Sequence, residues 1–262
     1  MTTRIIKPNN GVAASAKPTS GDEIAYYYDS HPTEEDLMGE STAQTDLIHY
    51  LRDVLTILYL SQTWFIACNL NIYMSGKYKE APIVPDLAVF KDVVLTRAQR
   101  LQLRSWKMWQ TGRPAPSVTF EISSDTTWLK DLEDKPAQYA KLGVTEYFAY
   151  DPNEPQEWRD KTKRLRGWRY QASATGADTG TEIIELSPNE QGWLWSEELD
   201  SWLVPDAEYL RLYTKDKTRR LTAAEKEHSA LENLLAKSEK EHAALETLLA
   251  KLRAKNIDPD TL

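Results

Sequence analysis

The chain has 262 residues, a formal net charge of -8, a pI near 5.2 and one cysteine, Cys68. This length allows one core of ordinary size with an appendage, and the acidic balance excludes a surface coated with nucleic-acid-binding charge, though not a local basic groove. The single cysteine excludes internal disulfides, no apolar run reaches membrane-spanning length, and residues 1–21 lack the apolar segment of a signal peptide. We therefore expect a cytoplasmic protein without membrane contact.

The first third of the chain predicts a tail, a helix and two strands. Residues 1–21 are polar and rich in Pro, Asn and Gly, which indicates a flexible tail. Residues 45–60 predict a helix with one apolar face, because Leu47, Leu51 and Leu58 recur at helical spacing. Residues 64–74 and 83–90 are rich in apolar side chains and predict one strand each.

A basic and aromatic segment follows at residues 97–113, where Trp106 and Trp109 alternate with arginines and a lysine. Such a mixture can hold a nucleic-acid backbone and stack bases. The mixture is also typical of a solvated loop whose tryptophans anchor it in the core. Both interpretations stay open from the sequence, and the loop interpretation is the commoner one.

Residues 118–151 predict a strand, a helix and a second strand, the βαβ unit of a sheet with helices packed on it. The first strand, residues 118–122, is apolar apart from Glu121. A carboxylate inside a buried strand is costly unless another group pairs with it. This cost is the first indication of a functional site.

The next part of the chain predicts three more strands, at residues 166–170, 182–186 and 209–213. A loop rich in Gly, Ser, Thr and Asp separates the first two of these strands. Tryptophans at positions 193, 195 and 202, with their apolar neighbours, are expected to cover the end of the sheet.

From Leu221 onward the chain becomes charged and rich in Ala, Glu, Lys and Leu, without Gly or Pro as far as residue 252. Residues 225–238 are repeated at 239–252, and this 14-residue tandem repeat predicts a helix. Its leucines recur at coiled-coil spacing, but Ser238 and His242 interrupt the seam, which indicates a weak coiled coil. A helix that binds a partner and a solvated helix are the alternatives.

Three residues carry the predicted chemistry: Asp86, Glu121 and Lys135. Two carboxylates presented from neighbouring strands can bind a hard cation such as Mg²⁺, which prefers oxygen ligands and keeps several waters. The backbone carbonyl of Ile122 is a further candidate ligand. A nearby lysine can orient a water molecule or stabilise developing charge on a phosphodiester.

Five short patterns between residues 85 and 152 occur in the order and spacing of a known nuclease family. They are Pro85-Asp86, Glu121-Ile-Ser-Ser, Asp131-x-x-x-Lys135, Tyr139 and Gly143-x-x-Glu146-Tyr147-x-x-x-Asp151-Pro152. This ordered set resembles the Uma-type restriction endonuclease family of the PD-(D/E)XK superfamily. The resemblance implies a restriction-endonuclease-like fold, a Mg²⁺ (or Mn²⁺) cofactor and DNA as a partner.

One position departs from the wider superfamily pattern, in which a lysine stands two residues after the strand glutamate and on the same face. Here that position is Ser123, and the resemblance assigns the role to Lys135, with Lys130 as the fallback. Pro136 supports this assignment, because proline is tolerated only in the first turn of a helix. The helix then begins at or after about residue 131, and Lys135 lies near its start.

Several neighbouring residues have structural interpretations that we weigh beside the functional ones. Glu40 is a further metal ligand by resemblance, but it is more often a capping or solvated residue. Asp131 is expected to cap the helix or to orient Lys135. Tyr139 and Tyr147 are expected in the core.

Together these patterns predict an α/β protein with a mixed sheet flanked by helices. The expected organisation is a tail at residues 1–21, a nuclease-like domain at 22–214 and a charged helical extension at 215–262. The predicted function is metal-dependent hydrolysis of DNA phosphodiester bonds. The oligomeric state stays open from the sequence; the resemblance makes a homodimer through the domain or the C-terminal helix one option. The alternative function is that of a catalytically silent binding or assembly module that acts through that helix. Convergence of Asp86, Glu121 and Lys135 favours the enzyme.

Overall fold

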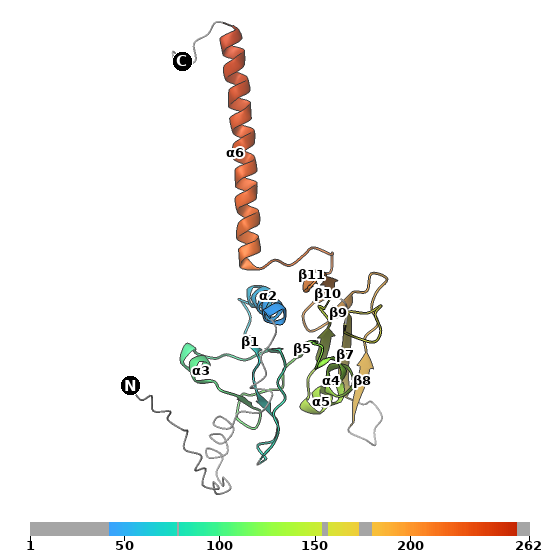
Figure 1. Ribbon diagram of the computed structural model, residues 1–262. Helices are drawn as coiled ribbons and strands as arrows, with labels where there is room; N and C mark the ends of the chain where they lie inside the picture. Colours follow the sequence, from blue (N-terminus) through green and yellow to red (C-terminus); the bar gives the residue numbers. More distant parts are fainter. Residues whose placement is uncertain (1–41, 78, 154–156, 173–179, 256–262) are drawn as a thin grey trace, which may run out of the picture.

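The computed structural model describes residues 42–77, 79–153, 157–172 and 180–255. Its centre is a six-stranded mixed sheet in the order β1-β3-β5-β6-β7-β8, and a long C-terminal helix, α6, projects from the domain (Figure 1). The mixed α/β class predicted from the sequence is confirmed. The predicted tail at residues 1–21 and the candidate ligand Glu40 lie outside the described residues.

The first predicted helix is confirmed as α2 (Thr42–Leu58), which begins three residues earlier than expected and buries its apolar face. The single strand expected at residues 64–74 is wrong. It is divided into β1 (Phe65–Cys68) and β2 (Ile72–Tyr73), because the chain turns at Asn69, whose φ of 50° lies in the left-handed region. Asparagine tolerates this conformation better than most residues.

The predicted βαβ unit forms the middle of the sheet. Strand β5 (Val118–Ile122) pairs in parallel with β6 (Glu146–Tyr150) and antiparallel with β3 (Leu87–Phe90). The connection contains two helices, α4 (Trp128–Glu133) and α5 (Lys135–Leu142). The predicted helix that begins at or after about residue 131, with Lys135 near its start, is confirmed as α5, but the connection also contains α4, which we did not expect as a separate helix. Helix α4 begins at Trp128, and α5 begins at Lys135, directly before Pro136.

The remaining strands of the main sheet are β7 (Leu165–Ala172) and β8 (Thr181–Glu185), both antiparallel to their neighbours. They confirm the strands predicted near residues 166 and 182. A second sheet, in the order β11-β10-β9, consists of β9 (Leu194–Ser196), β10 (Ser201–Asp206) and β11 (Tyr209–Tyr213). Only β11 was predicted. The segment with Trp195 and Trp202, expected to cover the end of the sheet, instead forms two of these strands.

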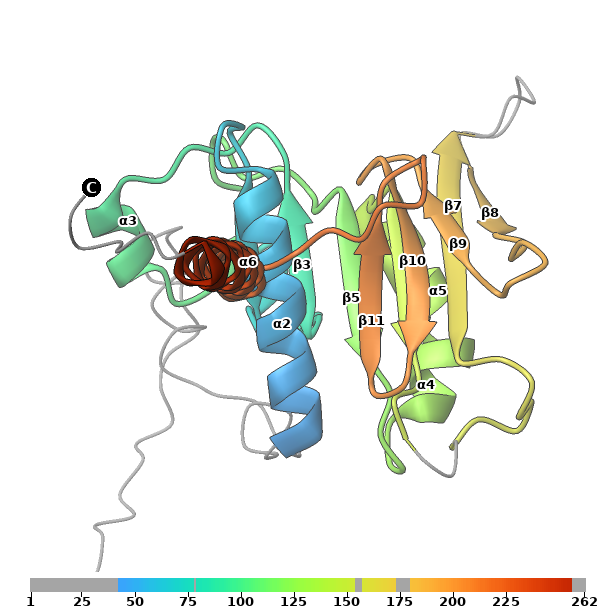
Figure 2. The ribbon, with the colours of Figure 1, turned by 90° about the horizontal axis from the view of Figure 1, so that it is seen from above.

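Both faces of the main sheet are covered. Figure 2 shows α2, β10 and β11 over one face, with α4 and α5 on the other. Alternate residues of β5 contribute to the two sides, since Phe120 packs with leucines of α2 and β10, whereas Glu121 points toward Tyr139 of α5. The strand is buried at all five positions, which agrees with its nearly continuous apolar sequence.

Glu146 joins the two sheets. Its carboxylate is fully buried and accepts hydrogen bonds from Arg169 Nε and Nη2 at 3.0 and 2.8 Å, and from the Ser196 hydroxyl. The backbone N–H groups of Glu197 and Glu198 also donate to it, at 3.0 and 3.3 Å. One carboxylate therefore links β6, β7 and the segment that follows β9.

The basic and aromatic segment forms α3 (Arg97–Gln102) and β4 (Trp106–Lys107), which pairs in parallel with β2. Trp106 is fully buried, its Nε1 donates to the Pro114 carbonyl at 2.8 Å, and the Arg113 guanidinium lies 4.3 Å from its ring centroid. At this tryptophan the structure favours the core-anchor interpretation over a base-stacking surface.

Helix α6 (Ala223–Ala254) confirms the helix predicted from the tandem repeat. Thr222 and Glu225 form a reciprocal capping box, and Glu225 also pairs with Arg211 at 3.2 Å and with Arg219. No residue of this helix is buried, and five of its leucines are more than half exposed: Leu231, Leu234, Leu235, Leu245 and Leu248. In the described part of the chain, no helix combines the length and the apolar character needed to cross a membrane.

Candidate active site

Glu121 lies near the carboxyl end of β5, and only 2% of its surface is exposed. Its carboxylate contacts Lys135 Nζ at 2.8 Å and accepts a hydrogen bond from the Tyr139 hydroxyl. Burial raises the pKa of Glu121 well above its ordinary value; the charge of Lys135 opposes this shift, and those of Asp86 and Asp131 add to it. The raised pKa of Glu121 reflects the cost of burying its charge, and Lys135 is the cation that offsets part of this cost.

Lys135 is the first residue of α5, and Pro136 follows it in the first turn. Its ammonium lies between two carboxylates, 2.8 Å from Glu121 and 3.2 Å from Asp131. Burial acts to lower the pKa of Lys135, but the charges of Glu121, Asp131 and Asp86 outweigh it and raise the pKa. The lysine is therefore held in its charged form.

Asp131 positions this lysine from the preceding helix. Its side chain is buried and accepts hydrogen bonds from the hydroxyls of Ser123 and Thr127, each at 3.1 Å. Ser123 occupies the place of the lysine in the wider superfamily pattern, so a hydroxyl at that place supports the carboxylate that orients Lys135. The predicted contact between Asp131 and Lys135 is present. Lys130, the fallback for the lysine role, is exposed on the surface of α4.

Asp86 reaches the same place from another strand. It directly precedes β3, and its Oδ2 accepts a hydrogen bond from the Ile122 N–H at 2.5 Å. Its charge also acts on Glu121 and Lys135. The structure therefore brings Asp86, Glu121 and Lys135 together at the end of β5, although 35 and 14 residues separate them in the sequence.

The backbone carbonyl of Ile122, a predicted metal ligand, accepts a hydrogen bond from Gln44 Nε2 at 2.9 Å. Sequence reasoning missed Gln44 and singled out Glu40, four residues earlier in the sequence. A signal was present, because Gln44 continues the apolar face of α2 formed by Leu47 and Leu51. A polar residue on a buried helix face needs a partner, and here the partner is the end of β5.

Tyr139 and Tyr147 are fully buried, as expected of core residues. Both also serve the site through their hydroxyls, since Tyr139 donates to Glu121 and Tyr147 donates to the backbone carbonyl of Asp131 at 2.7 Å. The sequence did not predict these contacts. They fix the strand carboxylate and the helix that holds Lys135.

The donor set suits a hard divalent cation with few protein ligands. Two carboxylates and one carbonyl, from Asp86, Glu121 and Ile122, are oxygen donors of the kind that Mg²⁺ prefers, and Mg²⁺ keeps several waters. Among the described residues, no group of three or more His, Cys, Asp or Glu side chains is arranged to hold a metal ion. The two carboxylates, Asp86 and Glu121, therefore fit a cation that takes few protein ligands and keeps its waters. Within the described ranges, no site with four protein ligands forms around a metal.

Comparison with known proteins agrees with the resemblance seen in the sequence. No curated protein matches the chain. A solved structure described as a "putative nuclease belonging to DUF820" from Anabaena variabilis is similar, with 14% sequence identity and a TM-score of 0.41 over 70% of this chain and 91% of that chain. A model of the Uma2 family, described as "Putative restriction endonuclease", matches residues 38–193, more than half of the chain. The chain therefore belongs to the Uma2 family of restriction-endonuclease-like proteins.

Proposed function

We propose that this protein is a divalent-metal-dependent endonuclease that hydrolyses phosphodiester bonds in DNA. The observation that carries the proposal is the convergence of Asp86, Glu121 and Lys135 on the end of β5, with a distance of 2.8 Å between the last two. Membership of a nuclease family supports hydrolysis of nucleic acid. The choice of metal rests on the chemistry of the donor set, and the choice of DNA rests on the family, whose description names a restriction endonuclease.

The proposed roles follow from the contacts. Asp86, Glu121 and the Ile122 carbonyl would hold Mg²⁺ or Mn²⁺, and such an ion, when bound, lowers the pKa of water and neutralises phosphate charge. The Lys135 ammonium donates hydrogen bonds to the attacking water or to a phosphate oxygen, because burial and two carboxylates fix its position and its charge. Asp131 acts as the positioning residue for this lysine.

The test is a titration of the purified full chain with MgCl₂ or MnCl₂, with supercoiled and single-stranded DNA present and the products followed on gels. We expect nicking or cleavage that begins on addition of the metal and stops on addition of EDTA. Cleavage that EDTA leaves unchanged would contradict the metal assignment. Absence of both metal binding and cleavage would instead favour a catalytically silent module that acts through α6.

We propose further that the chain associates with a second copy of itself through α6. Support comes from the leucines of its tandem repeat, of which Leu231 and Leu245 are 55% and 52% exposed, one in each copy of the repeat. Three glutamates at seven-residue spacing follow one edge of this seam: Glu232, Glu239 and Glu246. Like charges would face each other across a pair of such helices, so we expect the association to be weak at low ionic strength.

Self-association through α6 should therefore strengthen with added salt, because salt screens the repulsion between glutamates. Sedimentation equilibrium between about 0.05 and 0.5 M NaCl measures this effect. The double change Leu231→Glu and Leu245→Glu should leave a monomer at every salt concentration. The matched control, Asn233→Glu with Thr247→Glu, adds the same charge away from the seam and should retain the association. Equal masses for both double variants would remove α6 from the interface.

A further inference from the structure

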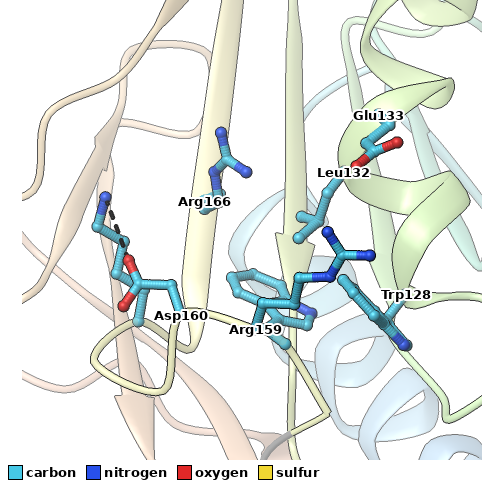
Figure 3. Close-up of a pocket in the computed structure, with 8 residues that line it drawn as sticks. Trp128, Leu132, Glu133, Arg159, Asp160 and Arg166 are labelled. Atoms are coloured by element: carbon cyan, nitrogen blue, oxygen red, sulfur yellow. Dashed lines mark ion pairs between the residues drawn. The ribbon is translucent and has the colours of Figure 1, made fainter.

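A pocket of about 320 Å³ lies between α4 and the segment that leads into β7. Its volume is at the lower end of the range for ligand pockets. Trp128, Leu132 and Glu133 of α4 form one wall, and Arg159, Asp160 and Arg166 lie across from them (Figure 3); Trp158 and Lys163 complete the lining. None of these residues belongs to the set proposed above to hold the metal.

The lining combines aromatic faces with cations. The Arg159 guanidinium lies 5.7 Å from the ring centroid of Trp128, and Figure 3 shows it extended between Leu132 and Trp128. The other two cations have carboxylate neighbours, Lys163 with Asp160 at 3.8 Å and Arg166 with Glu185 at 2.9 Å. Arg166 also lies 5.1 Å from the ring centroid of Trp168, which is not a lining residue. Arg159 is therefore the lining cation with a described contact to an aromatic face of the pocket itself, as at sites that stack bases.

Trp158 is the buried residue of the pocket lining. Its side chain is 1% exposed, and its Nε1 is a buried donor for which no described group provides an acceptor. A buried N–H without a partner is costly, and most such groups in folded proteins are paired. Trp158 belongs to a buried core cluster, and Trp128 and Leu132 of the opposite wall pack against this cluster.

The pocket is built onto the candidate active site. Helix α4 carries both Trp128, which lines the pocket, and Asp131, which orients Lys135. On the opposite wall, the Asp151 carboxylate accepts hydrogen bonds from the N–H groups of Glu157 and Trp158 at 2.7 and 3.1 Å. Asn153 Nδ2 then ties this segment to the Ser123 carbonyl at 3.1 Å, beside the end of β5. Both walls of the pocket are therefore connected to the strand end that carries the metal-binding candidates.

We propose that this pocket binds an unpaired nucleotide of the substrate strand, with its base stacked on Trp128 and a phosphate held by Arg159. Indole and guanidinium groups stack on the faces of bases, and those faces are covered in a duplex. The occupant is therefore a nucleotide outside base pairing, and the substrate is DNA with a single-stranded segment beside the cut. This inference deepens the proposed nuclease function and rests on it for the role of the pocket.

Binding is measured without cleavage, by fluorescence anisotropy in EDTA, with a labelled single-stranded oligonucleotide and a blunt hairpin duplex. Trp128→Ala should weaken single-strand binding by about 5- to 150-fold, the loss typical of one stacked base, and should leave duplex binding unchanged. Trp128→Phe should retain most of the affinity, because it keeps an aromatic face. Arg159→Ala should weaken binding and reduce the slope of log K against log salt by about 0.7, the value for one phosphate contact in a single strand.

The matched controls change residues of the same type elsewhere, Trp195→Ala on β9 and Arg52→Ala on α2, and should bind like the unaltered chain. Equal losses for single strand and duplex, or no loss in Trp128→Ala, would overturn the pocket assignment. The two proposals fail separately. Metal-dependent cleavage with no pocket-dependent binding would leave the nuclease function standing, whereas pocket-dependent binding without cleavage under any metal would remove the nuclease function alone.

Discussion

Glu121→Gln is expected to reduce metal-dependent DNA cleavage by at least about 100-fold, the scale of losing one group that acts on transition-state charge. Glutamine has nearly the same shape and can still accept the hydrogen bond from Tyr139 and contact Lys135. It has no negative charge, and so it is a poor ligand for Mg²⁺. The change should therefore remove the chemistry while the fold is preserved.

Initial rates on supercoiled DNA at saturating Mg²⁺ measure this loss, with circular dichroism as the check on folding. The matched control is Glu182→Gln, an exposed strand carboxylate on β8. It should cleave like the unaltered chain. Cleavage by the Glu121→Gln variant within a few-fold of the unaltered rate would show that the reaction takes place elsewhere.

The pH dependence of metal binding provides a second readout of the same residue. Burial raises the pKa of Glu121, so its carboxyl group stays protonated at pH values where an ordinary glutamate is ionised. A metal ion binds only the ionised form, and binding therefore releases a proton. Metal affinity, measured by calorimetry, should fall as the pH is lowered through a range above the ordinary glutamate pKa. The Glu121→Gln variant should lack this part of the dependence.

Glu146→Ala is expected to lower the free energy of unfolding by about 3–5 kcal/mol, the usual cost of removing one partner from a buried ion pair. The change leaves the Arg169 guanidinium, which is 22% exposed, without its carboxylate. It also removes the acceptor shared by Ser196, Glu197 and Glu198. Both sheets lose their common anchor, while the residues at the end of β5 keep their own contacts.

Urea denaturation followed by tryptophan fluorescence measures the loss. Glu182→Ala removes an exposed carboxylate from the same sheet and should change stability by less than about 0.5 kcal/mol. Similar midpoints for the two variants would mean that Glu146 does not hold the sheets together. Because Glu146 belongs to the family pattern, a stability loss without a change in metal affinity would show that part of this pattern encodes architecture.

The candidate site could be predicted from the sequence where a local rule fixed the position of a side chain. An isolated carboxylate in the apolar strand identified Glu121, and Pro136 placed Lys135 at a helix start. The contacts of Gln44 and Tyr139 could not be predicted in this way. They depend on how α2 and α5 pack against β5. The helical pattern marks Gln44 as a polar residue that needs a partner, but it does not identify that partner.

The fold was predictable where local composition favours one kind of element, as the short apolar run does in β5 and the helix-forming Ala, Glu, Lys and Leu do in α6. The prediction failed between residues 64 and 74, because one asparagine with a positive φ ends a strand that composition alone would continue. The prediction failed again at β9 and β10, where Trp195 and Trp202 are only partly buried. Their strands belong to a small second sheet, and a sheet with one face toward solvent has a weaker apolar signal than the central strands.

The length of α6 sets the distance between the domain and the far end of this helix. Its 32 residues span about 48 Å at 1.5 Å per residue, and its first turn is fixed to the domain through Glu225. Forty-eight ångströms is about the length of 14 base pairs of DNA at 3.4 Å each. A molecule held at the far end of α6 is therefore separated from the domain by more than one turn of the double helix. Shortening the repeat by 14 residues would reduce that separation by about 21 Å.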